Sequence, residues 1–198
     1  SGKKCLEISD TALEGFVIHP AFMKNGSETA GFYVGAYECS TDAGNSSKAA
    51  SIVGKAPLVS IDFPTMQSRC SARGTDWHLW NIYELAAIQM LCLVELGSPD
   101  VQAIIGSGNS SSSSAAVATG SSNAKWRGIS ELWGNVWHMV DGLKGNDTTI
   151  QILDRLGNGT YVNTGVAALA SSGYPKDMLD TSGTGFDFND VFVPKTLD

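Results

Sequence analysis

The segment from Trp126 to Gly142, WRGISELWGNVWHMVDG, limits what this chain can fold into more than any other part, because it holds three of the five tryptophans. The alternation of a strand would divide residues 133–140 into two faces, one with Trp133, Asn135, Trp137 and Met139 and the other with Gly134, Val136, His138 and Val140. Both faces are largely apolar, so the pattern predicts a central strand that is buried on both sides. A buried indole needs a hydrogen-bond partner for its N–H group. We therefore expect Trp133 and Trp137 to be core residues.

The length and the charge of the chain exclude several classes of protein. At 198 residues the chain is long enough to bury a core without disulfides or metals, and we expect a single domain over residues 1–198. The net charge is −7 and the 13 lysines and arginines form no basic cluster, so nucleic acid is not an expected partner. No apolar run reaches the ~18 residues of a membrane span. No hydrophobic stretch follows residues 1–4, so we expect neither membrane insertion nor a signal peptide.

The apolar periodicity and the turn residues predict two helices and several short strands. One helix is expected over residues 63–74 with Asp62 as its N-cap. The other is expected over residues 81–96, where apolar residues nearly all round indicate burial on most sides. Asn158-Gly159 predicts a hairpin turn. Strands are expected at residues 14–19, 32–38, 133–140, 148–153, 160–162 and 187–193.

Residues 106–124, GSGNSSSSSAAVATGSSNA, form a low-complexity segment without a charged or aromatic side chain. Such a segment buries too little apolar area to offset the entropy that it loses when it becomes ordered. We therefore expect a flexible Ser/Gly-rich insertion at the surface of the domain.

Residues 127–142 carry the pattern R-G-I-x-x-L-W-G-N-V-W-x-x-V-D-G. This pattern resembles the tryptophan-rich strand of the C-type-lectin-like fold, in the branch shared by formylglycine-generating enzymes, phage tail-fibre tips and the variable proteins of diversity-generating retroelements. Three upstream segments resemble the same branch in the same order: GFYVGAYE at residues 31–38, the expected helix at 63–74, and WHLW at 77–80 ahead of the second helix. The likeness covers roughly residues 14–195.

The resemblance implies a C-type-lectin-like α+β fold that is rich in loops. Two helices would flank a small twisted antiparallel sheet centred on residues 133–140. The resemblance also implies a structural core motif made of Trp126, Gly128, Trp133, Gly134, Asn135, Trp137, Asp141 and Gly142. Because this fold hosts both enzymes and binding proteins, the fold alone does not decide the function.

The positions of the cysteines and histidines do not support an enzyme. Formylglycine-generating enzymes oxidise with paired cysteines downstream of the tryptophan-rich strand, whereas no cysteine follows Cys92 in this chain. A redox mechanism needs an exposed thiolate of low pKa, and Cys70 and Cys92 fall in expected helices among apolar neighbours. The histidines lie on different elements without the spacing of a metal or hydrolase motif; they are His19, His78 and His138. We therefore expect no catalytic residue.

Metal and cofactor sites are not indicated either. The four cysteines have no CxxC spacing that would suggest zinc. Of these, Cys5 and Cys39 are left as a pair that could form a disulfide under oxidising conditions, which the sequence cannot decide. Calcium-dependent lectins carry Glu-Pro-Asn or Gln-Pro-Asp and a later Trp-Asn-Asp, of which residues 188–190, Phe-Asn-Asp, are only a faint echo. We expect no metal and no cofactor.

With an enzyme and a metal site not supported, the remaining hypothesis is a scaffold that displays a binding surface. We expect a non-enzymatic ligand- or receptor-binding protein, similar to viral (phage-type) receptor-binding proteins, tail fibres or retroelement-diversified variable proteins. The expected partner is a protein or glycan receptor on a host or neighbouring cell, and the expected location is a virion or an extracellular surface. Two alternatives stay open, an oxidoreductase of the formylglycine-generating type and a purely structural virion component.

The relatives carry their hypervariable binding surface in a further C-terminal segment, which ends in a strand paired with the first one. This sequence stops at Asp198, before any such segment. Residues 15–19 are expected to need a neighbouring strand for their backbone groups, and the four residues after Pro194 are too few to supply it. We therefore expect a C-terminal fragment of the same gene product to complete the sheet and to carry the ligand-binding residues.

Overall fold

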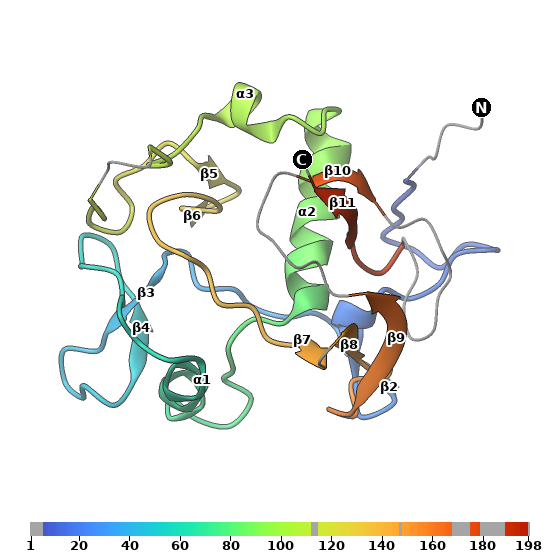
Figure 1. Cartoon of the computed structure of the whole chain (residues 1–198), viewed down its shortest axis with the longest axis horizontal. Coiled ribbons are helices and arrows are strands. Elements are labelled where there is room, and N and C mark those ends of the chain that lie inside the picture. The colour runs from blue at the N-terminus through green and yellow to red at the C-terminus, as the bar shows by residue number, and fades with distance from the viewer. Residues whose placement is uncertain (1–5, 112–114, 147, 168–174, 179–188, 198) are drawn as a thin grey trace. The chain divides into compact units, whose positions relative to one another are not determined.

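The computed structural model describes residues 6–111, 115–146, 148–167, 175–178 and 189–197 (Figure 1). Within these residues, three α-helices and small antiparallel sheets make up the regular structure, so the chain belongs to the α+β class. The helices are α1 (Phe63–Ser71), α2 (Ile82–Leu96) and α3 (Val101–Ile105), and one 3-10 turn, η1, covers Pro20–Phe22.

The strands are short and pair antiparallel. β7 (Leu143–Asn146), β8 (Thr149–Leu153) and β9 (Tyr161–Ala167) form a three-stranded sheet with β8 in the middle. The other described strands form two-stranded sheets, which pair β1 (Met23–Lys24) with β2 (Ser27–Glu28), β3 (Cys39–Thr41) with β4 (Ala49–Ser51), β5 (Lys125–Trp126) with β6 (Ile129–Ser130), and β10 (Pro175–Met178) with β11 (Pro194–Leu197).

The chain divides into two compact units. The first unit comprises residues 1–32, 81–94 and 140–198, and the second comprises residues 33–80 and 95–139. A separate apolar cluster lies within each unit, so each unit has a core of its own.

The first unit is built around α2, whose N-terminus is closed by a reciprocal pair of side chains. Asn81 Oδ1 accepts the backbone N–H groups of Tyr83 and Glu84 at 2.9 and 3.1 Å, and Glu84 Oε2 accepts the N–H of Asn81 at 2.8 Å. This capping box satisfies donors that the first turn of a helix leaves unpaired. The predicted start of the helix at Asn81 is therefore confirmed to within one residue.

The core of the first unit joins α2 to the three-stranded sheet and to residues near the C-terminus. Its buried side chains are those of Ile82, Tyr83, Ala86, Met90, Ile152, Val191 and Val193. The hydroxyl of Tyr83 donates to the carbonyl oxygen of Leu153 at 2.6 Å. Burial, followed by the nearby carboxylate of Asp190, raises the pKa of Tyr83, so its hydroxyl keeps the proton that it donates.

The predicted hairpin is confirmed, because β8 and β9 pair and Asn158-Gly159 lies in the loop between them, but the turn is formed by residues 155–156 and residues 158–159 form a bend. The carboxylate of Asp154 organises this loop: Oδ1 accepts the backbone N–H groups of Leu156 and Asn158 at 3.0 and 3.3 Å. Oδ2 accepts the N–H and the hydroxyl of Thr160 at 3.2 and 3.0 Å. One side chain therefore holds both ends of the connection in place.

In the second unit, α1 packs against the hairpin of β3 and β4. As predicted, Asp62 caps α1, and its Oδ1 accepts the N–H of Thr65 at 2.7 Å. At the other end, Arg73 Nη1 lies 2.8 Å from Asp42 Oδ2 and donates to the carbonyl oxygen of Ala49 at 3.2 Å, which fastens the helix to the hairpin. The buried core residues of this unit are Ala49, Met66, Cys70 and Leu79.

The predicted strand at residues 14–19 is wrong, because this segment pairs with no strand among the described residues. The segment begins with a turn at residues 14–15, where Gly15 has φ 83°, and η1 begins directly after residue 19. His19 is the N-cap of η1, so it belongs to this turn and not to a β-strand. Phe16, Val17 and Ile18 are all exposed.

The predicted strand at residues 32–38 is also wrong, and the first strand in this region is β3 (Cys39–Thr41). The backbone groups of residues 36–37 make single hydrogen bonds to separate partners and do not form a β-ladder. The carbonyl of Ala36 accepts the N–H of Ser130 at 2.8 Å, and the N–H of Tyr37 donates to the hydroxyl of Ser51 at 2.9 Å. One backbone partner on β6 and one side-chain partner thus take the place of the neighbouring strand that the alternation predicts.

The predicted strand at residues 133–140 is wrong as well, since this segment is irregular. Gly134 and Asn135 both have positive φ, 79° and 63°, which breaks the alternation of faces that a strand requires. The N–H of Asn135 donates to the carbonyl oxygen of Asn109 at 2.8 Å instead of to a ladder. The small sheet is therefore not centred on this segment.

The C-terminal part differs from expectation in two ways. β11 (Pro194–Leu197) pairs with β10 (Pro175–Met178), which was not expected, and neither strand pairs with residues 15–19. Of the expected strand at 187–193, residues 187–188 lie outside the described residues, and residues 189–193 form no strand. Val191 and Val193 are 1 % and 3 % exposed, because they fill the core of the first unit.

Candidate functional site

The residues of the predicted core motif do not form one cluster in a single unit. Trp126, Gly128, Trp133, Gly134, Asn135 and Trp137 belong to the second unit, whereas Asp141 and Gly142 belong to the first. The motif therefore supplies structure to both units, and its parts are described separately below.

Asn135 organises the irregular segment of the second unit through its side-chain amide. Its Nδ2 donates to Glu38 Oε2 at 2.6 Å and to the carbonyl oxygen of Val117 at 3.1 Å. Its Oδ1 accepts the N–H of Val117 at 2.8 Å and Nδ2 of Asn109 at 3.0 Å. The amide has two donors and two acceptor sites, and all of them are used. Asn135 therefore joins three chain segments that are far apart in sequence.

Glu38 lies at the centre of the same network. Its side chain is 6 % exposed, and its second oxygen, Oε1, lies 3.0 Å from His138 Nε2. The imidazole of His138 meets the ring of Trp80 edge-on, with 6.0 Å between the ring centroids. The indole of Trp80 donates in turn to the carbonyl oxygen of Met139 at 2.9 Å. Residues 135, 138 and 139 are thus each held by a specific partner.

Glu131 anchors the Ser/Gly-rich segment by a second buried carboxylate. The residue is 1 % exposed, and both of its carboxylate oxygens accept the N–H of Gly120 at 2.9 Å, while Oε1 also accepts that of Ser122 at 3.2 Å. Thr119 is 1 % exposed and donates to the carbonyl oxygen of Ile52 at 2.6 Å. Residues 119–122 of the expected insertion are therefore packed into the second unit, although the flexibility of residues 106–124 stays a prediction.

The three tryptophans of the motif have different surroundings. Trp126 is 8 % exposed, and within the described residues its indole N–H has no hydrogen-bond partner. Trp133 is half-buried, and its indole donates to the carbonyl oxygen of Gly106 at 2.9 Å. Trp137 is 96 % exposed, so the prediction that it is a core residue is wrong. The turn at Gly134 and Asn135 changes the direction of the chain, and strand alternation therefore does not carry its side chain inward.

The glycines of the motif permit tight backbone geometry. Gly128 has φ 84° in the turn between β5 and β6. A Cβ at Gly134 would lie 3.1 Å from the backbone of Asn109, and one at Gly142 would lie 2.7 Å from a methyl carbon of Leu153. Both positions have positive φ, which glycine adopts without strain, and at Gly134 a Cβ would also crowd the backbone of Asn109.

Asp141 performs a structural task in the first unit. Its carbonyl oxygen accepts the N–H of Ile82 at 2.8 Å, and its Oδ1 accepts the hydroxyl of Tyr161 at 3.0 Å. Burial, and then this hydrogen bond, raise the pKa of Tyr161. Lys144 Nζ lies 3.7 Å from the centroid of the same ring. Asp141 thus ties the start of α2 to β9.

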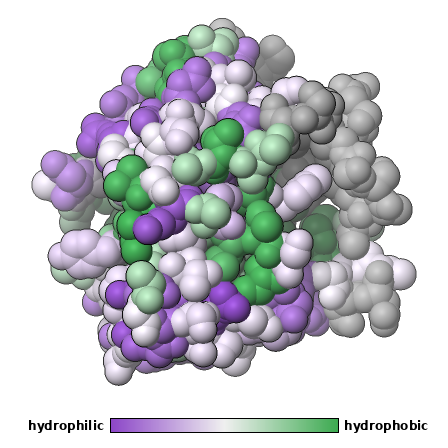
Figure 2. Space-filling model, turned by 90° about the vertical axis from the view of Figure 1, so that its left-hand side faces the viewer, coloured by the Kyte–Doolittle hydropathy of each residue, from purple (hydrophilic) through white to green (hydrophobic). Residues whose placement is uncertain are grey.

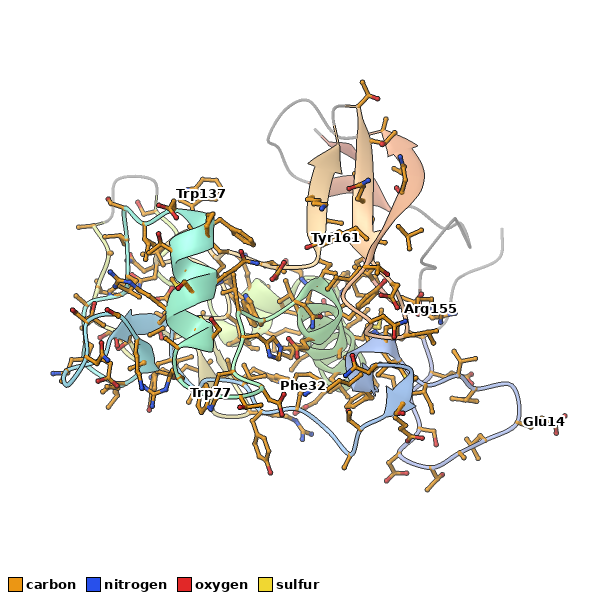
Figure 3. All side chains as sticks on the ribbon, turned by 90° about the horizontal axis from the view of Figure 1, so that it is seen from below. Glu14, Phe32, Trp77, Trp137, Arg155 and Tyr161 are labelled. Atoms are coloured by element: carbon orange, nitrogen blue, oxygen red, sulfur yellow. The ribbon has the colours of Figure 1, made fainter. Side chains whose placement is uncertain are left out.

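Large aromatic side chains project from the second unit into solvent. Tyr33, Trp77 and Trp137 are 106 %, 55 % and 96 % exposed. In the view of Figure 3, Trp137 lies toward one end of α1 and Trp77 toward the other. The guanidinium of Arg73 lies 5.2 Å from the Trp77 ring, which gives that ring a partner. The face shown in Figure 2 carries several groups of hydrophobic residues between hydrophilic ones.

Sequence reasoning missed the two buried carboxylates of the network in the second unit, those of Glu38 and Glu131. Glu38 ends the GFYVGAYE segment, and Glu131 stands between Ser130 and Leu132. Both lie beside largely apolar stretches, where a charged residue is buried only when it has hydrogen-bond donors. The position of each glutamate next to an apolar stretch was the sequence signal that could have indicated a buried carboxylate. The partners come from residues 117–138, and no local pattern connects them with residue 38.

The histidines and the residues of the faint calcium motif, for which the sequence predicts no site, have the following positions in the described structure. No group of three or more His, Cys, Asp and Glu side chains suited to a metal ion occurs among the described residues. Asp190, part of the faint calcium-motif echo, is buried, and its Oδ1 lies 2.8 Å from Arg155 Nη2. His19 lies in the first unit, while His78 and His138 lie in the second. Over the described residues, no helix has the length and apolar character needed to cross a membrane.

Comparisons with known proteins gave no match, either to a family model or to a curated protein. The resemblance to the C-type-lectin-like branch therefore stays a prediction from the residues that carry it.

Proposed function

We propose that this chain is a non-enzymatic binding protein that presents Trp137 to a receptor on a rigid support. Trp137 carries the proposal because its side chain is 96 % exposed while the residues around it are anchored. Asn135 on one side makes four side-chain hydrogen bonds, and the carbonyl of Met139 on the other accepts the Trp80 indole. His138, the next residue, is held by Glu38.

This arrangement suits recognition for physical reasons. An exposed indole in water forgoes a large hydrophobic gain that burial in a partner would recover. Tryptophan is enriched among the few residues that supply most of the binding energy of an interface. A backbone that is already fixed loses little conformational entropy on binding, so more of that energy remains as affinity. The support of Trp137 therefore matters as much as its exposure.

The proposed partner is a protein or glycan receptor on a host or neighbouring cell, with the chain located on a virion or an extracellular surface. A flat indole stacks on the apolar face of a sugar ring as readily as it fills an apolar protein pocket. The C-type-lectin-like fold belongs to the same proposal, since the residues of the motif resemble that fold and its members include receptor-binding proteins.

Binding to immobilised glycans and to intact candidate host cells tests this function. The wild-type chain should bind at least one glycan or cell type, and Trp137→Ala should lose that binding. Trp77→Ala is the matched control, because it removes another exposed tryptophan of the same unit. Equal binding by wild type and Trp137→Ala would remove Trp137 from the interface. The absence of any receptor would favour a purely structural virion component.

An oxidoreductase of the formylglycine-generating type is the alternative from another class. A thiol-oxidation assay on a cysteine-bearing peptide separates the two proposals. A binding protein should show no turnover, whereas turnover that is lost in Cys70→Ser or Cys92→Ser would establish the enzyme instead.

A further inference from the structure

Cys39 and Cys70 meet in the core of the second unit. Cys39 is half-buried on β3, and Cys70 is 6 % exposed on α1 and packs with Ala49, Met66 and Leu79. The two thiols are hydrogen-bonded to each other and are not joined as a disulfide. The pair is therefore a contact between two elements and not between neighbours in sequence.

The approach of the two thiols is fixed by contacts that do not involve sulfur. Arg73, which follows α1, binds the carbonyl of Ala49 on β4 and the carboxylate of Asp42 beyond β3. The carbonyl oxygen of Cys39 accepts the N–H of Leu58 at 2.8 Å. Both elements are thus held in place around the pair. Because Cys39 packs against the cluster that contains Cys70, we expect an S–S bond of about 2 Å to close by local movement within this core.

We propose that Cys39 and Cys70 form a redox site that low-molecular-weight disulfides, such as oxidised glutathione, convert to an intramolecular disulfide. In the first step the thiolate of Cys39 attacks one sulfur of the small disulfide. A mixed disulfide forms on Cys39, and one small thiolate leaves. In the second step Cys70 loses its proton to solvent and attacks the sulfur of Cys39. The second small thiolate then leaves, so two protein thiols are oxidised and one small disulfide is reduced to two thiols.

The surroundings of the two thiols assign their roles. The hydrogen bond from Cys70, opposed by burial and by the negative charge of Glu38, lowers the pKa of Cys39. The same hydrogen bond, together with burial, raises the pKa of Cys70. As a whole residue, Cys39 is half-buried, whereas Cys70 is buried. The attacking thiol is therefore Cys39, and the resolving thiol is Cys70.

The inference differs from both earlier expectations about cysteines. A Cys5–Cys39 disulfide was left open by the sequence, and Cys5 lies outside the described residues. The proposed reaction oxidises the protein itself and leaves any bound receptor unchanged, so it is independent of the proposed binding function. Its consequence is a covalent bond that joins β3 to α1.

Peptide mapping of the folded wild-type chain tests the inference. The reduced protein is freed of reductant, incubated with oxidised glutathione, alkylated and digested with trypsin. Cleavage after Lys4, Lys24 and Arg69 places Cys5, Cys39 and Cys70 in separate peptides. We expect a loss of two hydrogens in intact mass, a linked Cys39–Cys70 peptide pair, and a higher melting temperature for the oxidised form.

Two variants serve as controls. Cys92→Ser should form the same link, because Cys92 lies on α2 in the first unit. Cys39→Ser should leave Cys70 as an unmodified thiol, because Cys70 is buried. A stable glutathione adduct on wild-type Cys39, a Cys5–Cys39 link, or unreacted thiols at both positions would each overturn the proposal. The peptide map of the wild-type chain tests for the Cys39–Cys70 disulfide even if a variant fails to fold.

Discussion

Asn135 stabilises an irregular segment that has no sheet to support it. All four hydrogen-bonding positions of its amide are occupied, and its backbone has φ 63°. Asparagine tolerates this left-handed conformation better than most residues that carry a Cβ. Side chain and backbone therefore both favour asparagine at this position.

Replacing Asn135 should destabilise the second unit strongly. Asn135→Ala removes the partner of Glu38 Oε2 and one of the two acceptors of the Asn109 amide, so we expect a loss of about 2–4 kcal/mol in the free energy of unfolding. Asn135→Gly should cost less, because glycine adopts positive φ without strain. Chemical denaturation measures both. Asn163→Ala is the control, since that exposed side chain accepts one local N–H, and an equal loss in both alanine variants would contradict this account.

At the scale of elements, the capping box of α2 is a local feature that can be recognised from neighbouring residues in the sequence. Asn81→Ala removes the acceptor for two N–H groups at the start of the helix, and we expect the free energy of unfolding to fall by about 1 kcal/mol. Gln102→Ala, at an exposed position in α3, should change it little. A Gln102→Ala effect as large as that of Asn81→Ala would show that capping is not the cause.

The β8–β9 hairpin should lose stability in acid through Asp154. Burial alone would raise the pKa of Asp154, but hydrogen bonds from Thr160, Asn158 and Leu156 outweigh it and hold the pKa below its ordinary value. The stabilisation is therefore present above the unfolded pKa of about 3.9. It is lost as the pH falls through the folded pKa.

Thermal melts of wild type and Asp154→Asn between neutral pH and pH 3 measure this effect. Wild type should melt at the higher temperature near neutral pH, and the difference between the two proteins should shrink as Asp154 becomes protonated. A difference that is constant or grows toward low pH would contradict the assignment.

Elements with local signals were predictable, and elements that depend on distant partners were not. Asp62 and Asn81 identify helix starts and Asn158-Gly159 identifies a hairpin connection from neighbouring residues, and the two helix starts and the hairpin are confirmed. The alternation at residues 133–140 was a local signal as well, but the positive φ of Asn135 is maintained by Glu38 and Val117. Nothing in the immediate sequence reveals such partners. The exposure of Trp137 was missed for the same reason.

At the scale of the whole molecule, the sequence predicts one domain, whereas the structure divides the chain into two compact units. A single domain should unfold in one cooperative transition. If the two units unfold together as the predicted single domain, calorimetry should show one transition. Asn135→Ala in the second unit and Tyr83→Phe in the first should then both lower the midpoint of that transition. Two transitions, each shifted by only one variant, would show that the units are separate domains.

The expected further segment is also a prediction about the whole molecule. Residues 14–19 form no strand in the structure, so an unpaired opening strand no longer argues for it. The prediction of a C-terminal fragment that carries ligand-binding residues now depends on the resemblance alone. Intact mass and N-terminal sequencing of the purified native material would detect such a companion, and a single folded, monomeric 198-residue species would refute it.

The matched pair Trp126→Ala and Trp137→Ala tests the central claim most directly. Trp126 is 8 % exposed and Trp137 is 96 % exposed, so the two variants separate stability from binding. Melting temperature and binding to a glycan array or intact host cells are measured for both. Trp126→Ala should lose about 3–5 kcal/mol of stability, whereas Trp137→Ala should melt like wild type and bind no receptor. A Trp137→Ala protein that is strongly destabilised, or that melts normally and binds as wild type does, would contradict the account.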